Sequence, residues 1–380
     1  MKVSGPWLER PETQAVCAML ADAGHRALLV GGCVRNALLD MPVADVDIAT
    51  DARPERVIAL AEAAGLRAVP TGAAHGTVTV IANAIPHEVT TFRRDVQTDG
   101  RHATVAFSDD LAEDAARRDF TMNALYAAAD GTVIDPLGGL ADVVARHVRF
   151  VGDPRARIRE DYLRILRFFR FHAWYGDAAR GFDPEGLAAV AALAEGLDGL
   201  SRERVGAEMR RLLAAPDPAP AVAAMAATGV LARVLPGADA RALAVLVHLE
   251  AGAAPDWLRR LVVLGGESAP EGLRLSRAEA RALAALQGVI GSAASAGELG
   301  YRLGLARGAD AVLARAALLG DPPPPDWRTA LEQGAAAQFP LRAADLVDRF
   351  QGAALGTQLR EAEARWIASG FALSREELLA

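Results

Sequence analysis

The sequence is poor in the residues that build disulfide frameworks, zinc sites and membrane spans. Among its 380 residues, Cys17 and Cys33 are the only cysteines, too few for a disulfide framework or a structural zinc site. None of the seven histidines stands in an H-E-x-x-H pattern, which excludes a metalloprotease of that type. No apolar run reaches about 18 residues, so we expect no membrane-spanning helix and no membrane partner.

Three further patterns are missing. There is no G-x-x-x-x-G-K-[ST] loop, which excludes a P-loop NTPase, and no His-Asp dipeptide, so we expect no appended metal phosphohydrolase module. The first 20 residues carry four charged side chains and lack the apolar core of a signal peptide. With only two cysteines, the sequence favours a cytoplasmic location.

Charge is unevenly distributed along the chain. The net charge of −7 argues against diffuse electrostatic binding to nucleic acid. Residues 141–175, however, contain eight arginines and only four acidic residues. Any binding of nucleic acid is therefore expected to be local, and this segment is the candidate for it.

The pattern of apolar residues divides the chain into an α/β part and a helical part. Strands are predicted at 27–30, 45–48, 76–81 and 87–92, and helices at 12–23, 34–39 and 54–64. Residues 93–102 form a polar segment with a turn signal. After about residue 141 the strand signals fade, and 157–175 reads as one long helix. We expect an α/β head over 1–140, a helical neck over 141–200 and a helical body and tail over 201–380, a mostly helical α+β protein.

The first candidate site begins with Gly31, Gly32 and Arg35 and continues at Asp45 and Asp47. A glycine turn that opens a helix presents backbone N–H groups to an anion, and Arg35 adds a positive charge. On a strand, residues two apart share one face, which brings the two carboxylates together. This combination suits a Mg²⁺-dependent enzyme that acts on a nucleoside triphosphate.

A pair of aspartates has an ordinary interpretation as well, because aspartates often cap helices or close turns. The glycine turn and Arg35 upstream favour the metal interpretation here. Glu88 lies on a later predicted strand, with Thr90 on the same face. It fits equally well as a third carboxylate of the metal site and as part of a solvated strand face.

The second candidate motif is the run Arg117–Ala124. In the ordinary interpretation, Asp119 or Thr121 caps a helix over 123–129 and the arginines are surface charge. In the functional interpretation, Arg118 binds a phosphate, Asp119 binds a ribose hydroxyl and Asn123 braces the turn.

The third motif places Asp161, Arg164, Arg167 and Arg170 three residues apart, along one flank of the predicted helix. A simple salt bridge between Asp161 and Arg164 is one explanation. The other is base selection, because adenine and cytosine both present an amino donor beside a ring-nitrogen acceptor. A carboxylate and an arginine match that edge and leave unpaired polar groups against guanine or uracil.

These motifs together resemble the tRNA nucleotidyltransferase/poly(A) polymerase family, in the class shared by bacteria and eukaryotes (class II). The match runs from about Ala27 to Tyr175 in the family's order, and residues 135–142 fit it as a structural joint between the two halves. The signatures stand here as GGCVRN, ADVDIAT, HEVTTFRRD, DGRH, RRDFTMNAL, DPLGGLAD and REDYLRILRFFRF.

The resemblance implies a polymerase-β-type nucleotidyltransferase head followed by helical domains. It implies Mg²⁺ on Asp45 and Asp47, the triphosphate on Gly32 and Arg35, and a nucleotide contact by Arg118 and Asp119. Base selection would fall to Asp161 and Arg164, with support from Arg167 and Arg170. The family usually has Asp after Arg35, whereas this chain has Asn36.

Within the family, the expected activity is addition of C, C and A to the tRNA 3′ end from CTP and ATP, without a protein partner. The segment with Asp99, Gly100 and Arg101 resembles the loop with which CCA-adding enzymes switch from C to A. The basic and aromatic signature typical of poly(A) polymerases is missing. Polyadenylation and addition of A alone are the alternatives; a degenerate RNA-binding relative would be expected to lack Asp45 or Asp47.

Overall fold

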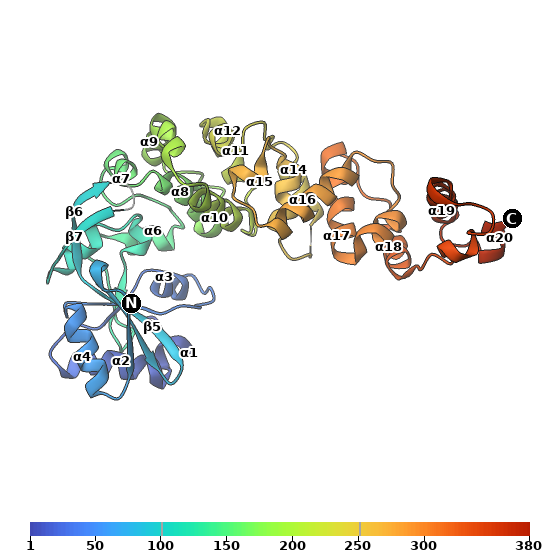
Figure 1. Cartoon of the computed structure of the whole chain (residues 1–380). Helices are drawn as coiled ribbons and strands as arrows, with labels where there is room; N and C mark the ends of the chain where they lie inside the picture. Colours follow the sequence, from blue (N-terminus) through green and yellow to red (C-terminus); the bar gives the residue numbers. More distant parts are fainter. Residues whose placement is uncertain (100–101, 251) are drawn as a thin grey trace. The chain divides into compact units, whose positions relative to one another are not determined.

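The computed structural model describes residues 1–99, 102–250 and 252–380 (Figure 1). The chain forms two compact units. Unit 1 contains Met1–Glu208 and Ala227–Arg233, and unit 2 contains Met209–Ala226 and Val234–Ala380. The finer division into head and neck stays a prediction.

A mixed seven-stranded sheet forms the centre of unit 1, in the order β3-β4-β5-β2-β1-β8-β9. Its neighbouring strands are antiparallel except β2 and β5, which are parallel and place Asp47 opposite Glu88. All four strand regions predicted from the sequence are present, and β3, β8 and β9 are additional. The strands are β1 (Leu28–Val30), β2 (Asp47–Thr50), β3 (Arg67–Gly72), β4 (Thr77–Ala82), β5 (Ile85–Thr91), β8 (Tyr126–Ala127) and β9 (Val133–Ile134).

The polar segment after β5 differs from the expectation of a loop. Arg93–Asp99 forms β6, which pairs antiparallel with β7 (His102–Phe107) in a separate two-stranded sheet. The sequence of β6 is mostly polar and shows no apolar alternation, which is why the pattern did not predict a strand there. Of the expected switching loop, Gly100 and Arg101 lie outside the described residues.

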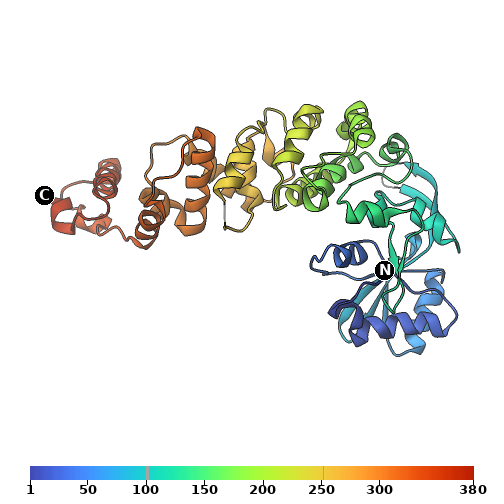
Figure 2. The ribbon, with the colours of Figure 1, turned by 180° about the vertical axis from the view of Figure 1, so that it is seen from behind.

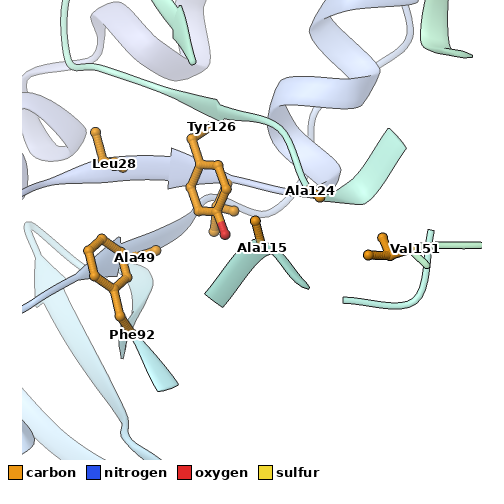
Figure 3. Close-up of a cluster of buried hydrophobic side chains, with 8 residues drawn as sticks. Leu28, Ala49, Phe92, Ala115, Ala124, Tyr126 and Val151 are labelled. Atoms are coloured by element: carbon orange, nitrogen blue, oxygen red, sulfur yellow. The ribbon is translucent and has the colours of Figure 1, made fainter. Parts of the chain in front are cut away.

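Helices cover the sheet and bury its apolar side chains. Helices α1 (Pro6–Glu9), α2 (Pro11–Asp22) and α4 (Pro54–Ala63) gather at the sheet in both views (Figures 1 and 2). The strands alternate as expected, so that Val78 and Val80 are fully buried on β4. A second cluster joins β1, β2 and β8 to α5 (Leu111–Ala116); Figure 3 shows Leu28, Ala49, Phe92 and Tyr126 within it.

The run Arg117–Ala124 does not cap a helix over 123–129, so that ordinary interpretation is wrong. Thr121–Asn123 is a single 3₁₀ turn, η2, and the chain enters strand β8 at Tyr126. The turn is covered by α6 (Gly139–Val144), whose Asp142 carboxylate accepts a hydrogen bond from the Thr121 hydroxyl at 2.6 Å. Residues 135–142 thus pack against this turn, and their expected role as a joint between the two halves stays a prediction.

The predicted long helix over 157–175 is two helices, α7 (Pro154–Glu160) and α8 (Leu163–Tyr175). Asp161 separates them because its backbone is extended, with φ of −155° and ψ of 106°. The apolar face of α8 packs into an aromatic cluster. There, the Phe120 ring lies 4.7 Å from Phe171 and 5.0 Å from Phe150.

The rest of the chain is helical, as predicted, and no further strand occurs among the described residues beyond 141. The remaining helices are α9 (Pro184–Leu193), α10 (Arg202–Leu213), α11 (Ala219–Ala227), α12 (Val230–Val234), α13 (Leu243–Leu249), α14 (Trp257–Leu264), α15 (Ala269–Gly272), α16 (Arg277–Ile290), α17 (Ala296–Leu319), α18 (Trp327–Ala336), α19 (Gly352–Ala368) and α20 (Arg375–Leu379). None of the described helices has the length and apolar character to cross a membrane. The mostly helical α+β class is confirmed.

Substitution of Gly139 by alanine tests how closely α6 packs on the turn η2. A Cβ atom at this position would lie 2.3 Å from the Thr121 carbonyl oxygen, so Gly139→Ala forces the backbones apart. We expect a loss of about 1–3 kcal/mol in the free energy of unfolding, measured by urea denaturation. Gly199→Ala is the control, because its Cβ would meet no atom within 4 Å. Equal stabilities of the two variants would contradict this packing.

Candidate active site

One cavity of about 210 Å³ brings together most of the first candidate site. It lies in unit 1 between α3 (Gly32–Leu38) and the segment that leads into β2. Gly31, with φ of 72°, makes the turn into α3 in the left-handed region that favours glycine. The cavity is lined by Gly32, Cys33, Arg35, Asn36, Pro42, Val43, Ala44, Asp45 and Asp47.

The two aspartates of the cavity have different surroundings. Asp47 begins β2 and is half-buried, whereas Asp45 precedes the strand and is exposed. Strand β2 therefore begins at Asp47 and not, as predicted, at residue 45. Both aspartates nevertheless line the same cavity. Burial raises the pKa of the Asp47 carboxyl to about 6, and the negative charges of Glu88 and Asp45 add to the rise. A bound cation would relieve this accumulation of negative charge.

The carboxylate oxygens of Asp45 and Asp47 suit a hard divalent cation. Carboxylate oxygens are the ligands that Mg²⁺ prefers, and it usually keeps water or substrate oxygens in its other positions. Across the described ranges, no three His, Cys, Asp or Glu side chains form a cluster that could hold a metal. Asp45 and Asp47 are therefore an open pair, and the part of Glu88 as a third ligand stays a prediction.

Arg35 is buried at the edge of the cavity and is held by neutral groups. Its Nη2 donates to the Asn36 Oδ1 at 2.8 Å and to the Tyr175 hydroxyl at 2.9 Å, and its Nη1 donates to the Asn123 Oδ1. The guanidinium also lies over the Tyr175 ring, 3.9 Å from its centroid. Arg35 thus connects α3 to η2 and to α8.

Arg118 lies beside the glycine turn. Its guanidinium is paired with Asp114 at 2.9 Å, and its Nε donates to the Tyr126 hydroxyl at 3.2 Å. A Cβ atom at Gly31 would lie 3.4 Å from Nη1 of Arg118. Arg118 is close enough to Asp47 to oppose the rise of its pKa, which places a positive charge near the predicted phosphate site.

Asp119 is the centre of a second hydrogen-bonded group. Its Oδ2 accepts from the Arg167 Nε at 2.8 Å, and its Oδ1 accepts from the Asn123 Nδ2 at 2.8 Å and the Phe120 backbone N–H at 2.9 Å. Burial alone would raise the pKa of Asp119, but Arg167 and these hydrogen bonds outweigh it and lower the pKa to about 2. Asn123 links Asp119 to Arg35 at the turn, and its assignment to nucleotide binding stays a prediction.

The proposed base-selecting residues are not arranged along one helical flank. Asp161 lies outside α8, and its Oδ2 accepts from the Arg204 Nη2 at 2.6 Å. Arg164 is paired with Glu160 and donates to the Arg157 carbonyl oxygen at 2.8 Å. A salt bridge between Asp161 and Arg164 is therefore wrong as an explanation of the pattern.

Arg167 and Arg170 do follow each other on α8, and both are held by acidic residues. Arg170 donates to the Glu208 Oε2 at 2.6 Å, and its guanidinium lies 4.6 Å from the Phe171 ring centroid. Arg167 lies 4.0 Å from Glu208 in addition to its bonds with Asp119. Two positive charges are thus kept in fixed positions on this side of α8.

The sequence patterns missed several partners of the site. These are Asp114, Tyr126, Tyr175, Arg204 and Glu208. Some carried a usable signal, because Asp114 stands four residues before Arg118, and Arg204 four before Glu208 on α10. Residues at that spacing face the same side of a helix. Nothing in the local sequence connects Tyr126 or Tyr175 to the site.

Family comparisons define the class of protein. The model described as Poly A polymerase head domain matches residues 27–149. The model described as Probable RNA and SrmB- binding site of polymerase A matches residues 181–241. The first match contains the cavity and both aspartates, which makes this chain a nucleotidyltransferase by class.

Similar proteins narrow the class to a family. A crystal structure of the Bacillus stearothermophilus CCA-adding enzyme in complex with CTP has 31% sequence identity and a TM-score of 0.73, and the match covers 94% of this chain and 92% of that one. The CCA-adding enzyme of Geobacillus thermodenitrificans is 42% identical over 216 residues, which are 56% of this chain and 52% of that protein. The chain belongs to the family of CCA-adding enzymes.

The human relative, mitochondrial CCA tRNA nucleotidyltransferase 1, is 40% identical over 217 residues, 56% of this chain and 50% of that protein. The chain thus spans about half the length of the curated relatives that it matches. A Thermotoga maritima CCA-adding enzyme complexed with tRNA shares the fold, with a TM-score of 0.70 at 17% identity. Nucleotidyltransferases of this family generally depend on a divalent metal, in agreement with the open carboxylate pair.

The Asp119–Arg167 pair gives a pH-dependent prediction. Because the pKa of Asp119 is lowered to about 2, its contribution to stability is present above its unfolded pKa of about 3.9 and is lost as pH falls toward 2. Arg167→Met should cost about 3 kcal/mol at pH 7, because it leaves a buried carboxylate without its cation. The difference from the wild type should shrink between pH 5 and pH 3, as measured by urea unfolding at each pH.

The exposed Arg159 provides the control for this measurement, because Arg159→Met removes the same charge from solvent. We expect that variant to stay within about 0.5 kcal/mol of the wild type at every pH. A deficit of Arg167→Met that is constant from pH 7 to pH 3 would refute the pairing as its cause.

Proposed function

We propose that this protein adds C, C and A to the tRNA 3′ end from CTP and ATP, without a nucleic-acid template, and releases pyrophosphate. The observation that carries the proposal is the cavity lined by Gly32, Arg35, Asp45 and Asp47, in a chain of the CCA-adding enzyme family. Relatives that match 56% of the chain bear the same activity in their names. We place the protein in the cytoplasm and assign it no protein partner.

The proposed chemistry takes place at Asp45 and Asp47. The tRNA 3′-hydroxyl oxygen attacks the α-phosphorus of the nucleotide, a new O–P bond forms, and the bond to the β-phosphate bridging oxygen breaks. The two carboxylates would hold Mg²⁺, and the ion would supply a positive charge that lowers the pKa of the hydroxyl and neutralises charge on the leaving pyrophosphate. Glu88, opposite Asp47 on β5, strengthens the negative potential that attracts the cation.

The remaining residues of the site bind and orient the nucleotide. Gly32 and Arg35 line the part of the cavity assigned to the β- and γ-phosphates, Gly31 makes the turn that leads into it, and Arg118 supplies a second positive charge. Asp119 faces the ribose hydroxyls in this proposal. Its two oxygens are oriented by Arg167 and Asn123, so a hydroxyl group would meet a carboxylate of fixed geometry.

Base selection is assigned to Asp161 and Arg164. The carboxylate of Asp161 is oriented by Arg204 and by the Leu163 backbone N–H at 3.1 Å, and it retains lone pairs for the amino group of cytosine or adenine. Arg164 would donate to the ring nitrogen of the same base. Arg167 and Arg170 support the helix face on which the base lies.

A single extension assay tests the activity and its alternatives. Purified protein is given a tRNA that ends before its CCA, with Mg²⁺ and each nucleotide alone or in combination. Three added nucleotides, in the order C, C, A, are the expected product. A long ladder of A would instead identify a poly(A) polymerase, and a single A on a tRNA ending in CC with no use of CTP would identify an A-adding enzyme.

The assignment of Asp47 as a metal ligand is tested with a matched pair of variants. Asp47→Asn should lower the extension rate by at least about a hundredfold, because it removes a charged ligand from the reacting centre. Asp40→Asn makes the same substitution at an exposed position with φ of 54°, which Asn tolerates, and its rate should match the wild type. Equal rates for both variants would remove Asp47 from the proposed mechanism.

Asp161→Ala tests base selection separately from chemistry. We expect the ratio of kcat/KM for CTP over UTP to fall by at least about tenfold, because the acceptor for the amino group is lost. The exposed Asp198, paired with Arg233 at 2.7 Å, gives the control variant Asp198→Ala. Unchanged discrimination in Asp161→Ala, with a folded protein by circular dichroism, would refute the role.

A further inference from the structure

The side-chain amide of Asn36 bridges Arg35 and the segment that precedes Asp45. Its Oδ1 accepts from the Arg35 Nη2 at 2.8 Å and from the Nε at 3.2 Å. Its Nδ2 donates to the Pro42 carbonyl oxygen at 2.8 Å. These partners fix the orientation of the amide, because a flipped amide would turn its NH₂ group toward the guanidinium donors.

A carboxylate at position 36 would behave differently in two ways. It would accept from Arg35 but would have no proton to donate to Pro42. It would also neutralise the guanidinium in a charge-assisted ion pair. The amide holds the same guanidinium without cancelling its charge.

The charge of Arg35 is in fact not balanced by a direct counter-ion. Among the described residues, no carboxylate forms an ion pair with it, and its hydrogen-bond acceptors are Asn36, Asn123 and the Tyr175 hydroxyl. Among the carboxylates, Asp119 has the strongest electrostatic effect on the pKa of Arg35. The Asp119 carboxylate is, however, already hydrogen-bonded to Arg167 and Asn123. The side chain is nevertheless only 6% exposed and lines the cavity.

A buried cation without a counter-ion is costly, and an anion in the cavity would relieve that cost. The face of the Tyr175 ring stabilises the cation only in part. We propose that Asn36 is a positioning residue that holds Arg35 in place as an uncompensated positive charge for the polyphosphate of the incoming nucleotide. The inference rests on the proposed function in placing the triphosphate in this cavity.

The test measures anion affinity directly. Inorganic triphosphate is titrated by calorimetry into the full-length protein without tRNA or added metal, at low ionic strength. Asn36→Asp should weaken binding about five- to tenfold, because the new carboxylate opposes the anion over a short distance in a partly buried site. Asn36→Ala removes one of three braces without adding charge, and the affinity should change by no more than about twofold because Asn123 and Tyr175 still hold the guanidinium.

Two further measurements separate this effect from a general loss of structure. The difference between Asn36→Asp and the wild type should shrink in 0.5 M KCl, because salt screens the added charge. In the extension assay, the KM values for CTP and ATP should rise by the same factor, since Asn36 is assigned to the phosphates and not to the base. Asn83→Asp, at an exposed turn in the same unit, adds the same charge and should bind triphosphate like the wild type.

The outcomes distinguish this inference from the proposed function. Equal triphosphate affinity of Asn36→Asp and the wild type would overturn the inference, as would an equal loss in Asn36→Ala. Failure of the wild type to bind triphosphate would overturn it as well. A wild type that binds triphosphate but does not extend tRNA would contradict the proposed function alone.

Discussion

The arrangement of the site depends on the hydrogen bonds that the Asp119 carboxylate accepts. Through Asn123 it reaches Arg35 on α3, and through Arg167 it reaches α8 and Glu208. Each of these polar groups is wholly or largely buried, and each would be costly if its partner were removed. The positions of α3, η2 and α8 in unit 1 are therefore fixed by polar contacts as much as by the aromatic cluster around Phe120.

Much of the head could be predicted from local patterns because its central strands bury apolar side chains on one or both faces. The apolar run at Leu28–Val30 is buried throughout, and the alternation around Val78 and Val80 has the two-residue period of a strand. The parallel pairing of β2 and β5 explains why Asp47 and Glu88 influence each other, and no local pattern encodes it. Strands β8 and β9, of two residues each, are too short to produce a period.

The break between α7 and α8 shows where spacing arguments fail. Asp161, Arg164, Arg167 and Arg170 are three apart, which favours one continuous helix, and no proline or glycine interrupts them. The chain nevertheless turns at Asp161, because its carboxylate accepts from the Leu163 backbone N–H and from Arg204. A polar side chain that bonds its own backbone competes with the helix. The partner on α10 lies 43 residues away in sequence, beyond the reach of any local pattern.

Asp47 and Asp119 show how different surroundings shift the pKa values of two aspartates in opposite directions. Both are shielded from water, which by itself raises a carboxyl pKa. Asp119 is surrounded by donors and keeps a pKa of about 2, so it stays ionised and serves as a fixed acceptor. Asp47 faces other carboxylates, its pKa rises to about 6, and this leaves it in need of a cation. Since structural carboxylates are normally satisfied by the protein, the unsatisfied Asp47 is the position at which the proposed metal would complete the site.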